Sequence, residues 1–185
     1  MRIEDGKGKN GDMSVSAAQR GNVSSKSAHR SYYVSRDDGQ AFNSVFDEIT
    51  SVSGDYTAYI KNTSVTRNLF IGSIEFHSVE NAKWKIWSVS GTAASGELIT
   101  PTNLNLISGR PSETIAMSGN VSITGLTNIA QLGSHRSQAL SESHMDFGGA
   151  LILGPGDAIA IELDAAVSGL VSHDVFFWFE TIGFS

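Results

Sequence analysis

The stretch Gly149-Ala-Leu-Ile-Leu-Gly-Pro-Gly-Asp-Ala-Ile-Ala-Ile-Glu-Leu-Asp164 decides the fold class, because it contains two strand-like runs joined by a tight turn. In the turn, Pro155 fixes φ, Gly156 can adopt a positive φ, and Asp157 can hydrogen-bond back to the backbone. After the turn the hydrophobic period is two, which predicts a strand with one face on a core. The core face would carry Ile159, Ile161 and Leu163, and the other face Ala158, Ala160, Glu162 and Asp164.

The last apolar run, Asp174–Ile182, is apolar on both faces of a strand. Val175, Phe177 and Phe179 fall on one face, whereas Phe176, Trp178 and Ile182 fall on the other. Such a strand has to be covered twice. We therefore expect it to be central in the domain or to meet another chain with its second face.

Short alternating runs separated by turn residues fill most of the chain, at the spacing of a sandwich or barrel. The expected strands are 56–61, 68–77, 83–89, 97–100, 113–117 and 121–124. Tyr32–Val34 is a further strand-like fragment. In 41–50, apolar residues follow a helical spacing, but the β-branched and aromatic content and the neighbouring strands favour a strand. Gly125–Ser143 is polar and predicts a long loop.

These elements predict an all-β protein, best described as a jelly-roll-like antiparallel β-sandwich with an extended N-terminal arm, with an up-and-down barrel as the alternative. We divide the chain into the arm, residues 1–31, and the sandwich domain, residues 32–185. The arm holds six bases and three acids, giving +3, whereas the remainder holds seven bases and sixteen acids, giving −9. The bases are Arg2, Lys7, Lys9, Arg20, Lys26 and Arg30.

The arm contains no aromatic residue and can hardly build a core, so it is either a solvated tail or a segment that becomes ordered on another protein. Nucleic acid is a poor candidate partner, because the acidic body would repel phosphate. The opening residues have no signal-peptide core and no apolar run reaches membrane-spanning length, so we expect synthesis in a cytoplasm and no membrane partner.

No residue pattern points to catalysis or to a cofactor. The chain has no cysteine, no G-x-S-x-G elbow, and five scattered histidines. His135 and His144 share the polar segment with Glu142 and Asp146, where a metal or acid–base site is conceivable, although ordinary surface histidines are favoured. We predict no catalytic, cofactor or metal residues and no enzyme activity.

Trp84 and Trp87 point to opposite faces of one expected strand, so one of them is expected in the core and the other at the surface. An exposed tryptophan can stack on a sugar ring, but a subunit contact is favoured. We name Trp87, Phe176 and Trp178 as candidate subunit-interface residues.

Three short motifs resemble one family. The opening Met1-Arg-Ile-Glu-Asp-Gly-Lys-Gly8 is similar to the start of many small virion proteins of tailed bacteriophages. Tyr59–Asn62 followed by Asn68–Ile74 resembles their hairpin, and Leu151–Asp157 with Ile159–Ile161 resembles their C-terminal turn and strand. The chain thereby resembles tailed-bacteriophage capsid decoration, or cement, proteins.

The resemblance implies a virion structural protein on the outer capsid surface, where it would stabilise contacts between subunits of the major capsid protein. It implies a homo-oligomer, expected to be a trimer, and no enzyme. The six bases of the arm become candidate capsid-binding residues. The alternative is a receptor- or carbohydrate-binding module of a phage tail fibre or spike, using Trp87 or the polar segment.

Overall fold

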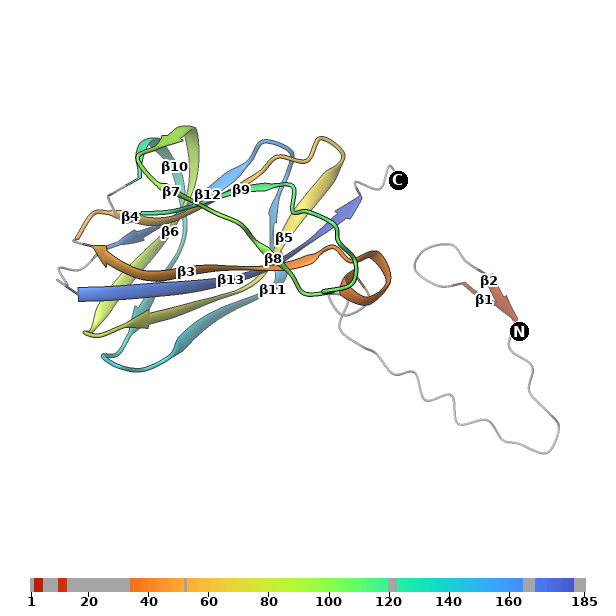
Figure 1. Cartoon of the computed structure of the whole chain (residues 1–185), viewed down its shortest axis with the longest axis horizontal. Helices are drawn as coiled ribbons and strands as arrows, with labels where there is room; N and C mark the ends of the chain where they lie inside the picture. Colours follow the sequence, from red (N-terminus) through yellow and green to blue (C-terminus); the bar gives the residue numbers. More distant parts are fainter. Residues whose placement is uncertain are drawn as a thin grey trace.

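The computed structural model describes residues 2–4, 10–12, 34–51, 53–119, 123–164 and 169–181. Its two large antiparallel sheets form an all-β sandwich, as the sequence predicts (Figure 1). The strands are β1 (Arg2–Glu4), β2 (Asn10–Asp12), β3 (Ala41–Ser51), β4 (Tyr56–Asn62), β5 (Arg67–Ser78), β6 (Ala82–Ala94), β7 (Glu97–Ile99), β8 (Thr102–Asn103), β9 (Thr114–Ser118), β10 (Thr124–Ser137), β11 (Ser143–Leu153), β12 (Ala158–Leu163) and β13 (Gly169–Thr181). One helical turn, η1 (Val34–Asp38), precedes β3.

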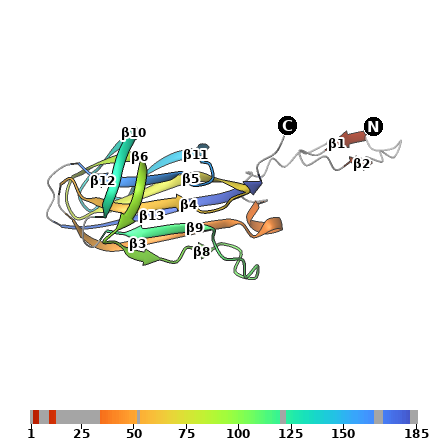
Figure 2. The ribbon, with the colours of Figure 1, turned by 90° about the horizontal axis from the view of Figure 1, so that it is seen from above.

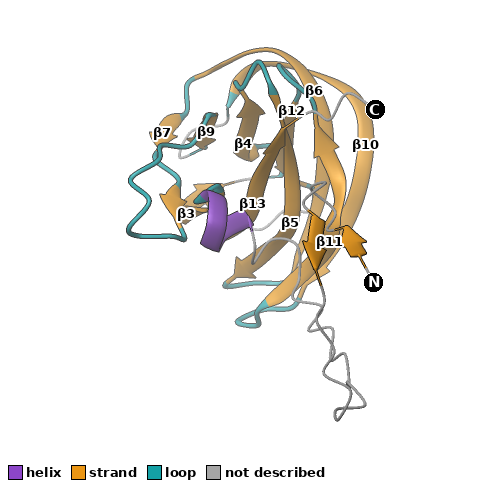
Figure 3. Ribbon diagram, turned by 90° about the vertical axis from the view of Figure 1, so that its right-hand side faces the viewer, coloured by secondary structure: helices purple, strands orange, loops and turns teal. Residues whose placement is uncertain are grey.

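Each sheet is named here after a central strand. The β13 sheet has five strands in the order β11-β5-β13-β3-β8, and the β12 sheet has six in the order β10-β6-β12-β4-β9-β7. Seen from one end, the two sheets form facing layers (Figure 3). The body is elongated along β3 and β13 (Figure 2). β1 and β2 pair with each other in a separate two-stranded sheet.

β13 lies between β3 and β5 along most of its length, which confirms the central position predicted for it. Val175, Phe177 and Phe179 point into the sandwich and are at most 2% exposed. Ile182, predicted on the opposite face, lies outside the described residues. One face of β13 packs in the sandwich core, and on the other face Trp178 and Phe176 pack with Phe70, Val34 and Ala41, which explains the continuous apolar run.

The interior core takes side chains from both sheets. Its bulkiest members are aromatic: Phe42 stacks on Phe177 at 5.7 Å between ring centroids, and Phe76 lies 5.6 Å from Trp84. Its fully buried large side chains include Phe42, Phe46, Ile60, Leu69, Ile71, Ile74, Phe76, Trp84, Ile86, Ile159, Leu163, Phe177 and Phe179. Burial of apolar surface on this scale is the main stabilising contribution to a domain of this size.

The predicted turn at Gly154–Asp157 is confirmed. The Asp157 amide donates to the Gly154 carbonyl at 3.1 Å, the Asp157 carboxylate accepts from the Gly154 amide at 2.9 Å, and Gly156 has φ of 87°. The two-face interpretation of β12 needs a correction, because Ala158 and Ala160 are also buried. They belong to a second apolar cluster on the outer face of the β12 sheet, with Tyr59, Val89, Met117 and Ile123.

The strand predicted at 41–50 is confirmed as β3. Phe42, Ser44 and Phe46 are buried, while Val45 between them is 45% exposed. This alternation has the period of a strand, so the helix-like spacing of the apolar residues was coincidental.

The long loop predicted at Gly125–Ser143 is wrong, because most of this segment is β10. β10 pairs with β6 from Thr124 to Ser137 and forms an edge of the β12 sheet. Most of its side chains are exposed, so it shows no hydrophobic alternation. Backbone pairing with one neighbour, rather than burial of a face, holds this strand.

The strand predicted at Tyr32–Val34 is also wrong for Val34, which is the one described residue of the three and begins η1. Tyr32 and Tyr33 lie outside the described residues. Within the part of the chain that the structure describes, no helix is long and apolar enough to cross a membrane.

Candidate interaction surfaces

The candidate arm residues are mostly outside the described part of the chain. Lys7, Lys9, Arg20, Lys26 and Arg30 are not described, and Arg2 is described only as part of β1, where it pairs with Asp12 of β2. A short hairpin therefore lies within the segment predicted to be extended. The proposed role of the six bases stays a prediction.

Trp178 and Phe176 lie on the outer face of the β13 sheet. The Trp178 indole stacks on Phe70 of β5, with centroids 5.7 Å apart and planes 9° from parallel, and it contacts Phe176 at 5.7 Å. Val34 and Ala41 complete the cluster. Trp178 is 2% exposed, and its Nε1 donates to Glu180 Oε1 at 2.9 Å, so its own chain covers it.

Two glycines allow this burial. A Cβ on Gly72 would lie 2.4 Å from the Phe176 ring, and a Cβ on Gly149 would lie 2.7 Å from the Trp178 indole. Gly149 belongs to a bulge in β11, where the register passes from Asp146 to Leu151 while β5 advances from Ser73 to Ile71. The backbone thus approaches the aromatic rings more closely than any other residue would permit.

Trp87 lies on the outer face of the β12 sheet, among charged side chains. Its Nε1 donates to Glu162 Oε2, and Lys85 Nζ lies 6.0 Å from the ring centroid. Lys83 and Lys85 both form ion pairs with Asp164 at the end of β12. The indole is half-buried, so Trp87 is a surface residue with its polar edge and one ring face engaged.

The ion pairs on this face change the ionisation of their members. Hydrogen bonds from Lys83 and Lys85 hold the pKa of Asp164 below its ordinary value. The Asp164 carboxylate in turn raises the pKa of Lys85. Asp164 and Lys85 therefore stay charged through the neutral range, which keeps this face polar beside the second apolar cluster.

His173 is a buried polar group between the two sheets. Its Nε2 lies 2.8 Å from Thr57 Oγ1, and Phe76 and Trp84 pack edge-on against the ring. Its Nδ1 has no hydrogen-bond partner. Burial lowers the pKa of His173 to about 3, so the imidazole is neutral at physiological pH. The sequence offers no signal that distinguishes this histidine from surface histidines.

The two histidines of the conceivable acid–base or metal site lie on different strands. His135 on β10 stacks on Phe76 at 4.9 Å and its Nε2 is buried, whereas His144 on β11 is exposed and pairs in register with Glu75. The expectation of ordinary surface histidines fits exposed His144, whereas His135 is half-buried with its Nε2 covered. Among the described residues, no group of three or more His, Asp or Glu side chains could hold a metal ion.

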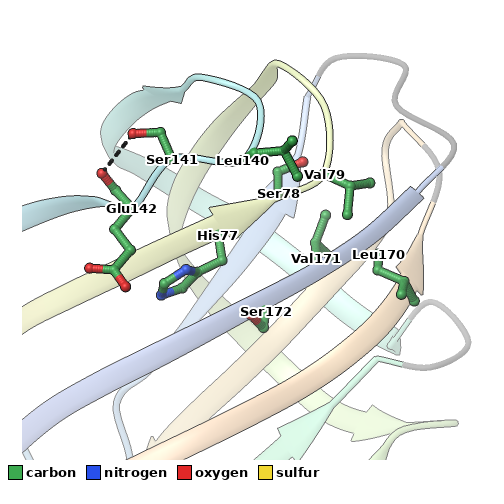
Figure 4. Close-up of a pocket in the computed structure, with 9 residues that line it drawn as sticks. All are labelled: His77, Ser78, Val79, Leu140, Ser141, Glu142, Leu170, Val171 and Ser172. Atoms are coloured by element: carbon green, nitrogen blue, oxygen red, sulfur yellow. Dashed lines mark hydrogen bonds between the residues drawn. The ribbon is translucent and has the colours of Figure 1, made fainter.

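The structure has two apolar surfaces at the ends of the sandwich that the sequence did not predict. At one end, the loop after β8 exposes Leu104, Leu106 and Ile107; we call these three residues the apolar finger. At the other end is a surface hollow of about 340 Å³ (Figure 4). We call it the β13 hollow; it is lined by His77, Ser78, Val79, Leu140, Ser141, Glu142, Leu170, Val171 and Ser172. Single exposed aliphatic residues carry no sequence signal of this kind, because their grouping depends on the fold.

A comparison with protein-family models found no match, and neither did a comparison with curated protein sequences.

Proposed function

We propose that this protein is a virion structural protein, a capsid decoration or cement protein that binds the outer surface of a phage head and stabilises contacts between major capsid protein subunits. The proposal includes a homo-oligomer, expected to be a trimer, and no catalytic role. One observation carries it: a sandwich whose interior core comes from residues 42–179 follows a basic leading segment of 31 residues without aromatic side chains. Such a segment is available to lie along another protein.

We further infer that the sandwich is a jelly roll. β3 and β5 flank β13, and β4 and β6 flank β12, so the first half of the body pairs with the second half. The chain changes sheets between β3 and β4, β4 and β5, β5 and β6, and again between β10 and β11, β11 and β12, and β12 and β13. This nested pairing supports a two-sheet jelly roll, into which β7, β8 and β9 are inserted.

The geometry around Trp87 favours a structural role over the carbohydrate-binding alternative. A sugar platform needs a free ring face, whereas Lys85 lies over the Trp87 ring and Glu162 accepts the indole proton. The polar segment that could have formed a binding loop is a paired edge strand. Both features weaken the tail-fibre alternative relative to the decoration protein.

The test compares the full chain with two variants on undecorated heads of the phage that carries the gene. The first variant lacks residues 1–30; the second keeps the length but replaces the six arm bases with serine. We expect both to keep the circular dichroism spectrum of the body and to lose head binding in co-sedimentation. If the arm binds through its charges, head binding by the full chain should also weaken progressively as the salt concentration rises.

Wild-type occupancy by both variants would exclude the arm as the binding element. If the full chain itself never sediments with heads, the decoration proposal is wrong. Binding to a glycan array that Trp87→Ala abolishes would instead support the carbohydrate-binding alternative.

A further inference from the structure

The apolar finger exposes more aliphatic surface than a turn in solution needs. Leu104, Leu106 and Ile107 are 47%, 84% and 95% exposed, although turns at this position usually carry polar residues. Water-exposed aliphatic side chains that are grouped on one loop are typical of a contact with another molecule.

Asparagine side chains hold the finger in one conformation. Asn103 Nδ2 donates to the Gly39 carbonyl at 2.9 Å and to Ser108 Oγ at 2.8 Å, and Asn105 Nδ2 donates to the Ser35 carbonyl at 3.0 Å. These bonds tie the loop to η1 and to the segment that leads into β3. A loop ordered before binding loses little conformational entropy on binding.

The β13 hollow contains an aliphatic side chain in a strained backbone conformation. Leu140 has φ of 55°, in the left-handed region that glycine and asparagine favour, and it is 85% exposed. Val79 and Leu170, each 42% exposed, lie beside it on the apolar side of the hollow (Figure 4). A leucine that is both strained and exposed is unfavourable in an isolated chain. Its presence here therefore points to a contact between this side chain and another molecule.

The finger and the hollow cannot meet within one chain. β13 begins at Gly169, next to the hollow residue Leu170, and the finger joins the opposite end, where the Leu104 amide donates to the Ala41 carbonyl at the start of β3. Figure 1 shows the loop after β8 beside η1, at the end away from the start of β13. Along β13, the run from Leu170 to Trp178, which pairs with Ala41, places roughly 26 Å between the hollow and the point where the finger joins the sandwich.

Their charges are complementary. Residues 101–109 carry no charged side chain, and exposed Arg110 follows the finger after Ser108 and Gly109. Glu142, also exposed, lies on the polar side of the hollow. An aliphatic loop flanked by a cation thus matches an aliphatic hollow flanked by an anion.

We infer that the apolar finger of one copy binds in the β13 hollow of the next copy, with Leu106 and Ile107 against Leu140, Val79 and Leu170. The contact joins two different surfaces, so it repeats from head to tail. It closes into a ring if the rotation between copies permits and extends as a chain if it does not. The expected number of three copies rests on the proposed function. The contact between copies does not, because it needs no capsid.

The experiment measures the mass of the purified full-length chain by sedimentation over a concentration series. The finger variant is Leu106→Ser with Ile107→Ser, and the hollow variant is Leu140→Asn, which suits the left-handed backbone. We expect each variant to weaken self-association at least about tenfold, since each removes aliphatic surface from the contact. The hollow variant should keep or raise the melting temperature, so weaker association would not reflect misfolding.

Ile129→Ser is the matched control, because Ile129 on β10 is 65% exposed and belongs to neither surface. It should leave self-association unchanged. A second control reverses the charges: Arg110→Glu and Glu142→Arg should each weaken association a few-fold, and the double variant should recover it.

An equimolar mixture of the finger and hollow variants decides the geometry. The finger variant keeps its hollow and the hollow variant keeps its finger, so one intact contact can form and heterodimers should appear without larger species. A monomeric wild type at all concentrations, or wild-type association in both variants, would overturn the inference. Variants that are both monomeric and form no heterodimer would also overturn it, because an intact finger on one copy and an intact hollow on another would then not be enough to form the contact. None of these measurements uses phage heads, so they do not depend on the outcome of the head-binding test.

Discussion

Each sheet has a tryptophan on its outer face, but the side chains around the two tryptophans differ. On the β13 sheet, Trp178 is 2% exposed and stacks between aromatic rings over two glycines. On the β12 sheet, Trp87 is half-buried and its surroundings are ion pairs of Lys83, Lys85 and Asp164. Apolar packing is insensitive to salt and pH, whereas exposed ion pairs are not, so the two faces should respond differently to the same perturbations.

The largest difference should come from truncating the two tryptophans. We expect Trp178→Ala to lower the free energy of unfolding by about 3–5 kcal/mol, because it empties a buried site. Trp87→Ala should cost about 1–2 kcal/mol, because its indole is partly in water already. Denaturant unfolding measures both values. Equal losses would show that the two faces are packed alike.

The close approach of the backbone to Trp178 can be tested at Gly149. Gly149→Ala adds a Cβ 2.7 Å from the indole at φ of 84°, whereas Gly156→Ala adds one at φ of 87° with no atom within 4 Å. Both substitutions strain the backbone by about 1–2 kcal/mol. We expect Gly149→Ala to cost about 1–3 kcal/mol more than Gly156→Ala, because of crowding. Equal unfolding free energies would place the indole away from Gly149.

His173 provides a pH dependence that belongs to neither outer face. Its pKa is about 3 in the folded chain and near 6.5 when unfolded, so between these values the unfolded chain binds one more proton. Stability should therefore be highest above pH 6.5 and fall below it by up to about 1.4 kcal/mol per pH unit, levelling off near pH 3. His173→Gln should remove this slope, and replacement of exposed His144 by glutamine should retain it. If His173→Gln keeps the slope, groups other than His173 cause the pH dependence.

The smallest effect should be that of salt on the charged face. Lys83 and Lys85 hold the pKa of Asp164 low, so this carboxylate stabilises the fold above its unfolded pKa and loses that contribution as the pH falls through the folded one. At pH 7, Asp164→Asn should lower the melting temperature slightly in dilute buffer and hardly at all in 1 M salt, where the screening length is about 3 Å. Trp178→Ala should lose the same stability in both buffers. A salt-independent Asp164→Asn effect would contradict an ionic origin.

Several features were determined by the sequence itself because their causes are local. The turn at Gly154–Asp157 needs three particular residue types in order, and the period of two in β12 follows from the alternation of side chains along a strand. The double apolar pattern of 174–182 showed that both faces of β13 have to be covered, but the pairing with β3 and β5 decided that this strand is central and not only a surface for another chain. The candidate arm comes from charge and composition, the proposed virion role comes from the resemblance of short motifs, and both remain predictions.

Other features were decided only by tertiary contacts. β10 is a strand because β6 offers it a backbone ladder, and an edge strand in water needs no hydrophobic period. Ala158 and Ala160 are buried because a second cluster covers the outer face of β12, which the local alternation does not reveal. The pKa of His173, the fit of Gly149 beneath Trp178, and the finger and hollow at opposite ends likewise depend on segments far apart in the chain. The pattern along the sequence predicts on which face of a strand a side chain lies. Only the folded chain decides which other residues contact it there.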